Sequence, residues 1–115
     1  MRKFIGVFLS LVALAGCTSR HTVYSWGHYE DVVYSSYAKR GQVPPEKQIE
    51  ELEQDYQEAR SNHQPAPPGW HAHLGSLYYQ VGKLDQAKQE FETEKATFPE
   101  SAVFMDRLLA RLKKP

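Results

Sequence analysis

The stretch HLGSLYYQVGKLDQAKQEFETEKATFP, residues 73–99, decides the fold of this chain. Its apolar and small side chains recur at steps of three and four on either side of Gly82, and this spacing is typical of amphipathic helices. A glycine between two such patterns favours a turn. The stretch therefore predicts two helices, over 70–81 and 84–98, that fold back on each other as a hairpin.

The same stretch resembles a tetratricopeptide repeat, a helix–turn–helix unit of about 34 residues. The residues that match the repeat pattern are Leu74, Gly75, Tyr78, Gly82, Ala87, Phe91 and Pro99. The resemblance places one repeat at 68–101, with Gly75 and Ala87 small because the two helices cross closely there. Trp70 and Glu94 depart from the pattern. Glu94 stands where a small residue is expected, and we expect it to loosen packing onto the next helix.

Helical spacing also covers the rest of the chain beyond residue 28. Helices are predicted over 29–40 and 46–62, and Ser101 is expected to cap a last helix. The apolar stripes that face the core are expected to be Tyr29, Val32, Val33 and Tyr37; Ile49, Leu52, Tyr56 and Ala59; and Phe104, Met105, Leu108, Leu109 and Leu112. No segment alternates with period two for long enough to predict a sheet. We expect an all-α domain over 28–115, built from short tetratricopeptide-like hairpins and a C-terminal capping helix.

The first 17 residues differ in composition from this domain. Arg2 and Lys3 precede the apolar run FIGVFLSLVALA, residues 4–15. A run of twelve is too short to span a bilayer and is typical of a secretory signal peptide. Gly16 and Cys17 follow this run, and Cys17 is the single cysteine of the chain, so no disulfide within the chain can form.

Leu14, Ala15, Gly16 and Cys17 resemble the lipobox of bacterial lipoproteins. That resemblance implies a signal peptide at 1–16, a diacylglyceryl group on the Cys17 thiol, an N-acyl chain (palmitate or similar) on its amine, and a short tether at 17–27. Thr18 in place of Asp implies the outer membrane, facing the periplasm, if the source has two membranes. The alternative is an ordinary signal peptide with an incidental buried cysteine.

The segment YSWGHYEDVVYSSY, residues 24–37, is similar to a family of small bacterial lipoproteins of unknown function. Members have one tetratricopeptide-like region and tend to accompany lipoproteins resembling the curli-secretion pore subunit. This resemblance implies an envelope protein as partner and brings no catalytic residues.

Little in the sequence indicates an enzyme. Formal charge is balanced at 14 basic and 14 acidic residues, so no global field favours nucleic acid. His71 and His73 are two residues apart and are expected to form a surface pair, not a metal site. The acidic side chains of 46–58, Asp55 among them, are expected to be a solvated face. No cofactor, metal or small-molecule substrate is predicted.

The function expected from these features is docking of a protein at the membrane. In tetratricopeptide repeats the first helix of each pair lines the concave face, which implies partner contacts at Ala72, Ser76, Tyr79 and Gln80. Tyr79 is the best of these, because its neighbour Tyr78 belongs to the core. Two alternatives stay open: a lipoprotein that binds or activates at the peptidoglycan, and a small envelope hydrolase.

Overall fold

The computed structural model describes residues 22–113, and this part of the chain is all-helical, as predicted. No strand occurs within it. The expected signal peptide, the lipobox-like residues and Cys17 lie outside the described residues. The elements are α2 (Tyr29–Ala38), α3 (Pro45–Ser61), α4 (Trp70–Gln80), α5 (Leu84–Thr97), a 3-10 turn η1 (Pro99–Ser101) and α6 (Ala102–Leu112).

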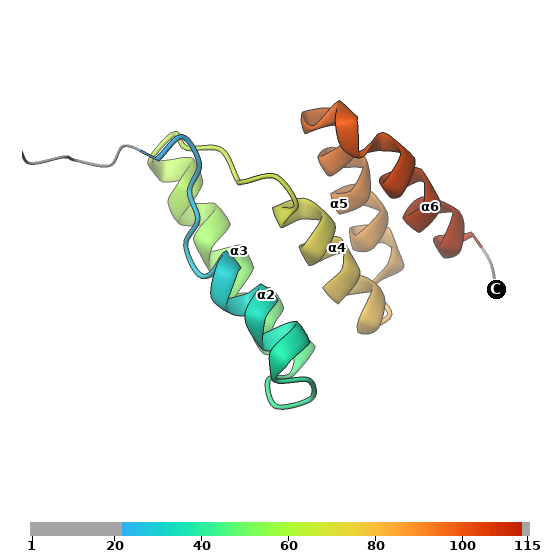
Figure 1. Cartoon of the computed structure of the whole chain (residues 1–115), viewed down its shortest axis with the longest axis horizontal. Coiled ribbons are helices and arrows are strands. Elements are labelled where there is room, and N and C mark those ends of the chain that lie inside the picture. The colour runs from blue at the N-terminus through green and yellow to red at the C-terminus, as the bar shows by residue number, and fades with distance from the viewer. Residues whose placement is uncertain (1–21, 114–115) are drawn as a thin grey trace, which may run out of the picture.

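The helices pack in chain order as two hairpins and a last single helix (Figure 1). α2 lies against α3, α4 lies between α3 and α5, and α6 covers the remaining side of α5. The helix boundaries follow local sequence signals. Pro45 occupies the first turn of α3, where a missing N–H costs nothing, and Pro99 ends α5 and opens η1. The hairpins and the terminal helix thus lie where the sequence places them, while their kinship with tetratricopeptide repeats stays a prediction.

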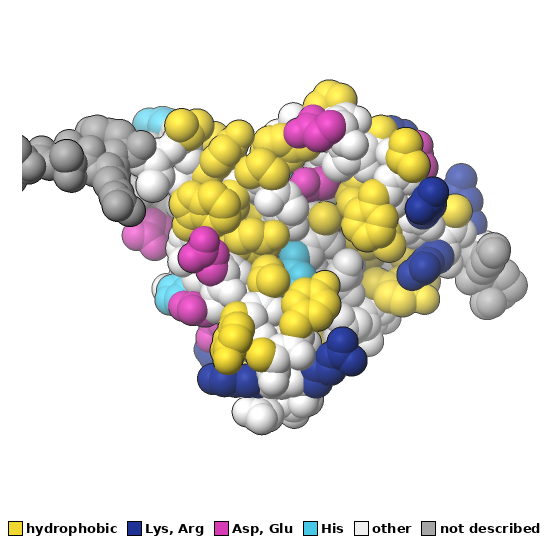
Figure 2. Space-filling view, viewed as in Figure 1, with side chains coloured by type: hydrophobic (Ala, Val, Ile, Leu, Met, Phe, Trp, Pro, Cys, Tyr) yellow, Lys and Arg dark blue, Asp and Glu magenta, His cyan; other side chains and the backbone are white. Residues whose placement is uncertain are grey.

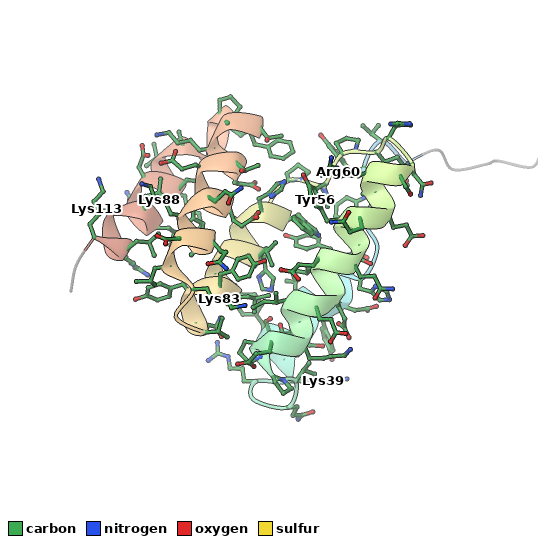
Figure 3. The ribbon with its side chains drawn as sticks, turned by 180° about the vertical axis from the view of Figure 1, so that it is seen from behind. Lys39, Tyr56, Arg60, Lys83, Lys88 and Lys113 are labelled. Carbon is green, nitrogen blue, oxygen red and sulfur yellow. The ribbon has the colours of Figure 1, made fainter. Side chains whose placement is uncertain are left out.

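A single hydrophobic core runs through the helices, with α4 at its centre. Trp70, Leu74, Leu77 and Tyr78 are buried on α4 and contact Leu52 from α3 and other apolar side chains of its neighbours. The Tyr56 ring of α3 stacks on Trp70 with centroids 5.3 Å apart, and Figure 3 shows Tyr56 pointing from α3 toward α4.

The hairpin α4–α5 closes around Gly75, as the sequence predicts. A Cβ at Gly75 would lie 2.6 Å from the Phe91 ring, closer than real Cβ contacts come, and 3.2 Å from the Ala87 carbonyl oxygen, which is a tight contact. Ala87 itself is fully buried. Gly82 has a φ of +78° in the turn between the helices, a conformation that glycine adopts without strain.

Two expected apolar stripes are only partly buried. Val32 and Met105 reach the core, but Tyr37 is 67% exposed and Phe104 is 59% exposed. α2 and α6 each have one packed neighbour in the hairpin order, so neither helix can bury a wide stripe. Ser101 precedes α6, but its hydroxyl donates back to the Phe98 carbonyl at 2.7 Å and does not cap α6.

Candidate functional site

The side of the molecule formed by α2, α4 and α6 presents exposed aromatic side chains to solvent. These helices lie on the near face in Figures 1 and 2, whereas α3 and α5 lie on the opposite face, which is nearest the viewer in Figure 3. Tyr37, Tyr79 and Phe104, one from each helix, are 67%, 49% and 59% exposed. We call this side the docking face and define it by Tyr37, Ala72, Ser76, Tyr79, Gln80 and Phe104.

Two shallow hollows indent the docking face. The first, about 250 Å³, lies over the N-terminal half of α4 between α2 and the start of α6. The second, about 210 Å³, lies between the C-terminal halves of α4 and α6. Ser76 lines both hollows, so they adjoin along α4. The lining residues of the first include Tyr29, Val33, Tyr37 and Phe104, and those of the second include Phe91, Leu108, Arg111 and Leu112.

The four contact residues expected from the sequence lie together on this face. Ala72 and Ser76 are partly buried, and they line the first hollow. Tyr79 and Gln80 are exposed beside the second. Tyr78 points the other way: it is 7% exposed, and its hydroxyl donates to Glu53 of α3. The structure brings the four residues onto one surface, and whether a partner binds there stays a prediction.

Sequence reasoning assigned Tyr37 and Phe104 to the core, yet both line the first hollow. The signal that could have identified them is the width of the stripes. Five apolar residues on an eleven-residue helix exceed what one neighbouring helix can cover, and Met105 already fills the central position at 1% exposure.

The lining of the first hollow is mostly apolar and carries no charged side chain. His73 lines it, and the Nε2 atom of His73 lies 3.2 Å from the Ser36 hydroxyl, which lies outside the hollow and 2.5 Å from Gln48 Oε1. Burial lowers the pKa of His73 below its usual value of 6.5, so the ring is neutral at pH 7. A neutral lining favours an apolar group with few hydrogen-bonding atoms.

The expectation of a surface pair at His71 and His73 is wrong for His71. Its side chain is buried on the side of α4 that faces α3 and α5, where its ring packs against Tyr56 and its Nδ1 atom lies 2.6 Å from Oε2 of Glu90. The two imidazoles lie on different sides of α4, as residues two apart on a helix must. Within residues 22–113, no group of three or more His, Cys, Asp and Glu side chains is arranged to hold a metal ion.

Two buried carboxylates cap the first helix of each hairpin, and sequence reasoning missed both. Asp55 of α3 is 6% exposed and accepts the backbone N–H of His28, before α2, at 2.5 Å. Glu94 of α5 is 2% exposed and accepts the backbone N–H of Gly69, before α4, at 2.7 Å. Asp55 therefore does not belong to a solvated face, and Glu94 joins α5 to α4 instead of loosening the packing. Neither helix start has a side-chain cap of its own, but the same holds for α3, α5 and α6, so the sequence carried no signal for these two contacts.

The start of the domain lies earlier than the sequence suggests. A tether is expected through residue 27, but residues 22–27 lie against the helices. The Ser25 N–H donates to the Pro65 carbonyl at 2.9 Å, and the Tyr24 ring packs on Phe98 with centroids 6.2 Å apart. Only residues 18–21 remain between Cys17 and the described fold.

Comparison with known families agrees with this earlier start. Residues 23–108 match the family model described as Domain of unknown function (DUF4810). The chain belongs to this family. The DUF4810 match begins inside the expected tether and covers the five helices up to Leu108 of α6, so it includes all six residues that define the docking face. No curated protein and no solved structure matches the chain. Within residues 22–113, no helix is long and apolar enough to cross a membrane.

Proposed function

We propose that this DUF4810 protein is a lipoprotein anchored through Cys17, and that its helical domain docks an envelope protein without catalysing a reaction. The docking face carries the proposal, since three helices each present an exposed aromatic side chain around two apolar hollows. The location is the periplasmic side of the outer membrane. The partner belongs to an envelope pore or assembly complex of the curli-secretion type.

The size of the hollows favours a protein partner over a small molecule. Pockets for small ligands usually enclose about 300–1,000 Å³, whereas these hollows enclose about 250 and 210 Å³. Each has room for one or two side chains of a partner. Exposed tyrosine and phenylalanine side chains supply much contact area at a small cost in conformational entropy, and aromatic residues are enriched in protein interfaces. We therefore expect apolar anchor residues of the partner to enter the hollows between Tyr37, Tyr79 and Phe104.

The anchor is tested at Cys17. Cys17→Ser removes the thiol that would accept the diacylglyceryl group, so labelled palmitate should not be incorporated and the precursor should remain uncut. Normal membrane residence of the Cys17→Ser chain would contradict the anchor.

The docking face is tested by capture of a partner from detergent-solubilised envelopes. Tyr79→Ala and Phe104→Ala should each weaken binding of the captured protein by about five- to thirtyfold, as truncation of a central aromatic contact does. Leu84→Ala is the matched control, because Leu84 is 44% exposed but lies on α5, outside the docking face. Circular dichroism should show unchanged helicity in all three variants.

Two outcomes would contradict docking of a protein. One is equal capture by Tyr79→Ala, Phe104→Ala and the native chain. The other is recovery of the lipoprotein alone under gentle conditions, together with cosedimentation on purified sacculi, which would favour the peptidoglycan alternative.

A further inference from the structure

Three segments at one edge of the molecule carry almost no charge, although the exposed Arg60 at the end of α3 lies beside them (Figure 3). These segments are residues 22–27, 62–69 and 96–105, which together contain one charged side chain, Glu100, and one histidine, His63. With 24% of the whole chain charged, about six charged side chains would be expected among these 24 residues. The opposite edge is richer in charge than the chain as a whole: seven of the 17 residues in 39–47 and 81–88 are charged.

Direct contacts hold the three uncharged segments together. The Ser25 N–H donates to the Pro65 carbonyl at 2.9 Å, and the Gln64 side-chain amide donates to the Thr22 carbonyl at 3.3 Å. The Tyr24 ring reaches Phe98 at the end of α5. In Figure 1 residues 62–69 and the junction of α5 and α6 lie at the upper edge, and residues 22–27 run from this edge down to α2. The turns at 39–44 and 81–83 lie at the lower edge.

The uncharged edge exposes apolar side chains. Val23, Trp26 and Val103 are 74%, 39% and 69% exposed, and three prolines are also exposed. Figure 2 shows hydrophobic side chains gathered along this edge. We call these residues the uncharged rim: Val23, Trp26, Pro65, Pro68, Pro99 and Val103.

The chain leaves the described fold at this rim. Four residues, 18–21, separate Cys17 from Thr22. Five residue steps span at most about 18 Å even when fully extended. If Cys17 carries acyl chains in the bilayer, the rim is therefore held within this distance of the membrane surface, while the charged edge lies on the far side of the domain.

We propose that the uncharged rim rests in the interfacial layer of the lipid bilayer, with Trp26 and Val23 among the headgroups. Tryptophan and tyrosine favour this layer, where one end of the ring is in an apolar environment and the other is hydrated. Few charged side chains would lose hydration there, and Glu100 disfavours a strongly anionic surface. Apart from Phe104, which lies within 96–105, the docking face lies on the side of the molecule between the two edges, so it stays open to a protein partner. This inference rests on the lipid anchor of the proposed function.

The test uses the acylated chain reconstituted into phosphatidylcholine vesicles whose acyl chains carry bromine, which quenches nearby tryptophan. Trp26 should lose emission intensity and shift to shorter wavelength, while Trp70, which is 3% exposed, reports the protein interior. Trp26→Phe should abolish both changes. Gln42→Trp, added to Trp26→Phe, places a tryptophan at the charged edge and should show no quenching.

The outcomes separate this inference from the anchor and from docking. If the protein floats with the vesicles but Trp26 is not quenched, or if the Gln42→Trp chain is quenched equally, the inference is overturned while the anchor stands. A chain that does not float with the vesicles indicates failure of the anchor, and with it of the inference. Loss of partner capture in detergent on Trp26→Ser would assign the rim to the protein partner and also overturn the inference.

Discussion

Replacing Glu94 by alanine distinguishes two opposite accounts of the α4–α5 hairpin. The repeat pattern expects a small residue at this position, so Glu94→Ala should improve packing and raise stability. The structure makes Glu94 the cap of α4, so the same substitution should lower the free energy of unfolding. The sign of the change therefore decides between the pattern and the contacts.

The magnitude follows from the groups that lose a partner. The Gly69 N–H lies 2.7 Å from Glu94 Oε1, and the Ala72 N–H lies 3.4 Å from Oε2. Loss of a helix N-cap costs about 0.5–2 kcal/mol, and a buried donor left without a partner costs about 1–3 kcal/mol. These costs overlap, so we expect Glu94→Ala to lower the free energy of unfolding by about 2–4 kcal/mol. For a domain of this size that lowers Tm by roughly 10–20 °C.

Urea unfolding followed by circular dichroism measures this change. Glu94→Gln keeps an acceptor oxygen and loses the negative charge at the helix N-terminus, so it should cost only about 1 kcal/mol. Glu92→Ala is the matched control: Glu92 is exposed on the same helix, and its loss should change stability by less than about 0.5 kcal/mol. A Glu94→Ala chain as stable as the native chain, or more stable, would refute the capping argument.

Three further predictions follow from the same contacts. Gly75→Ala gains helix propensity of about 1 kcal/mol, but its Cβ meets the Phe91 ring at 2.6 Å, so we expect a net loss of about 1–3 kcal/mol in urea unfolding; a gain would show that Phe91 moves aside freely. The pKa of His28 is raised above 6.5, chiefly by its hydrogen bond to Asp55 and then by the charge of that carboxylate. Protonated His28 therefore stabilises the folded state below pH 6.5, and this contribution is lost as the pH rises through the raised pKa. The stability difference between the native chain and His28→Gln should therefore shrink as the pH rises above 6.5, by a small amount because His28 is largely exposed, and a difference independent of pH would contradict the ion pair. Finally, the purified mature chain should melt below about 80 °C, because two hairpins and one helix are near the minimum that a helical stack needs; cooperative melting above that temperature would show that the core is stronger than this.

Local sequence signals were sufficient for the helices and for the main hairpin. Apolar spacing located each of the five helices to within a few residues, and the small residues at Gly75 and Ala87 marked the helix crossing. These features could be predicted because helix periodicity and turn formation depend on residues close together in the sequence. The position of Tyr79, opposite the buried Tyr78, followed from the same periodicity.

The tertiary structure decided how the polar and aromatic side chains are used. Asp55 and Glu94 accept hydrogen bonds from backbone N–H groups 27 and 25 residues earlier in the chain, and no local pattern indicates such a contact. Tyr37 and Phe104 read as core residues, yet they are exposed because α2 and α6 lie at the ends of the stack. Periodicity shows which side chains share a face of a helix, but only the packing of neighbouring helices determines whether that face is covered. The docking face and the uncharged rim are therefore properties of the assembled helices, and the sequence alone supplied their residues without showing that they meet.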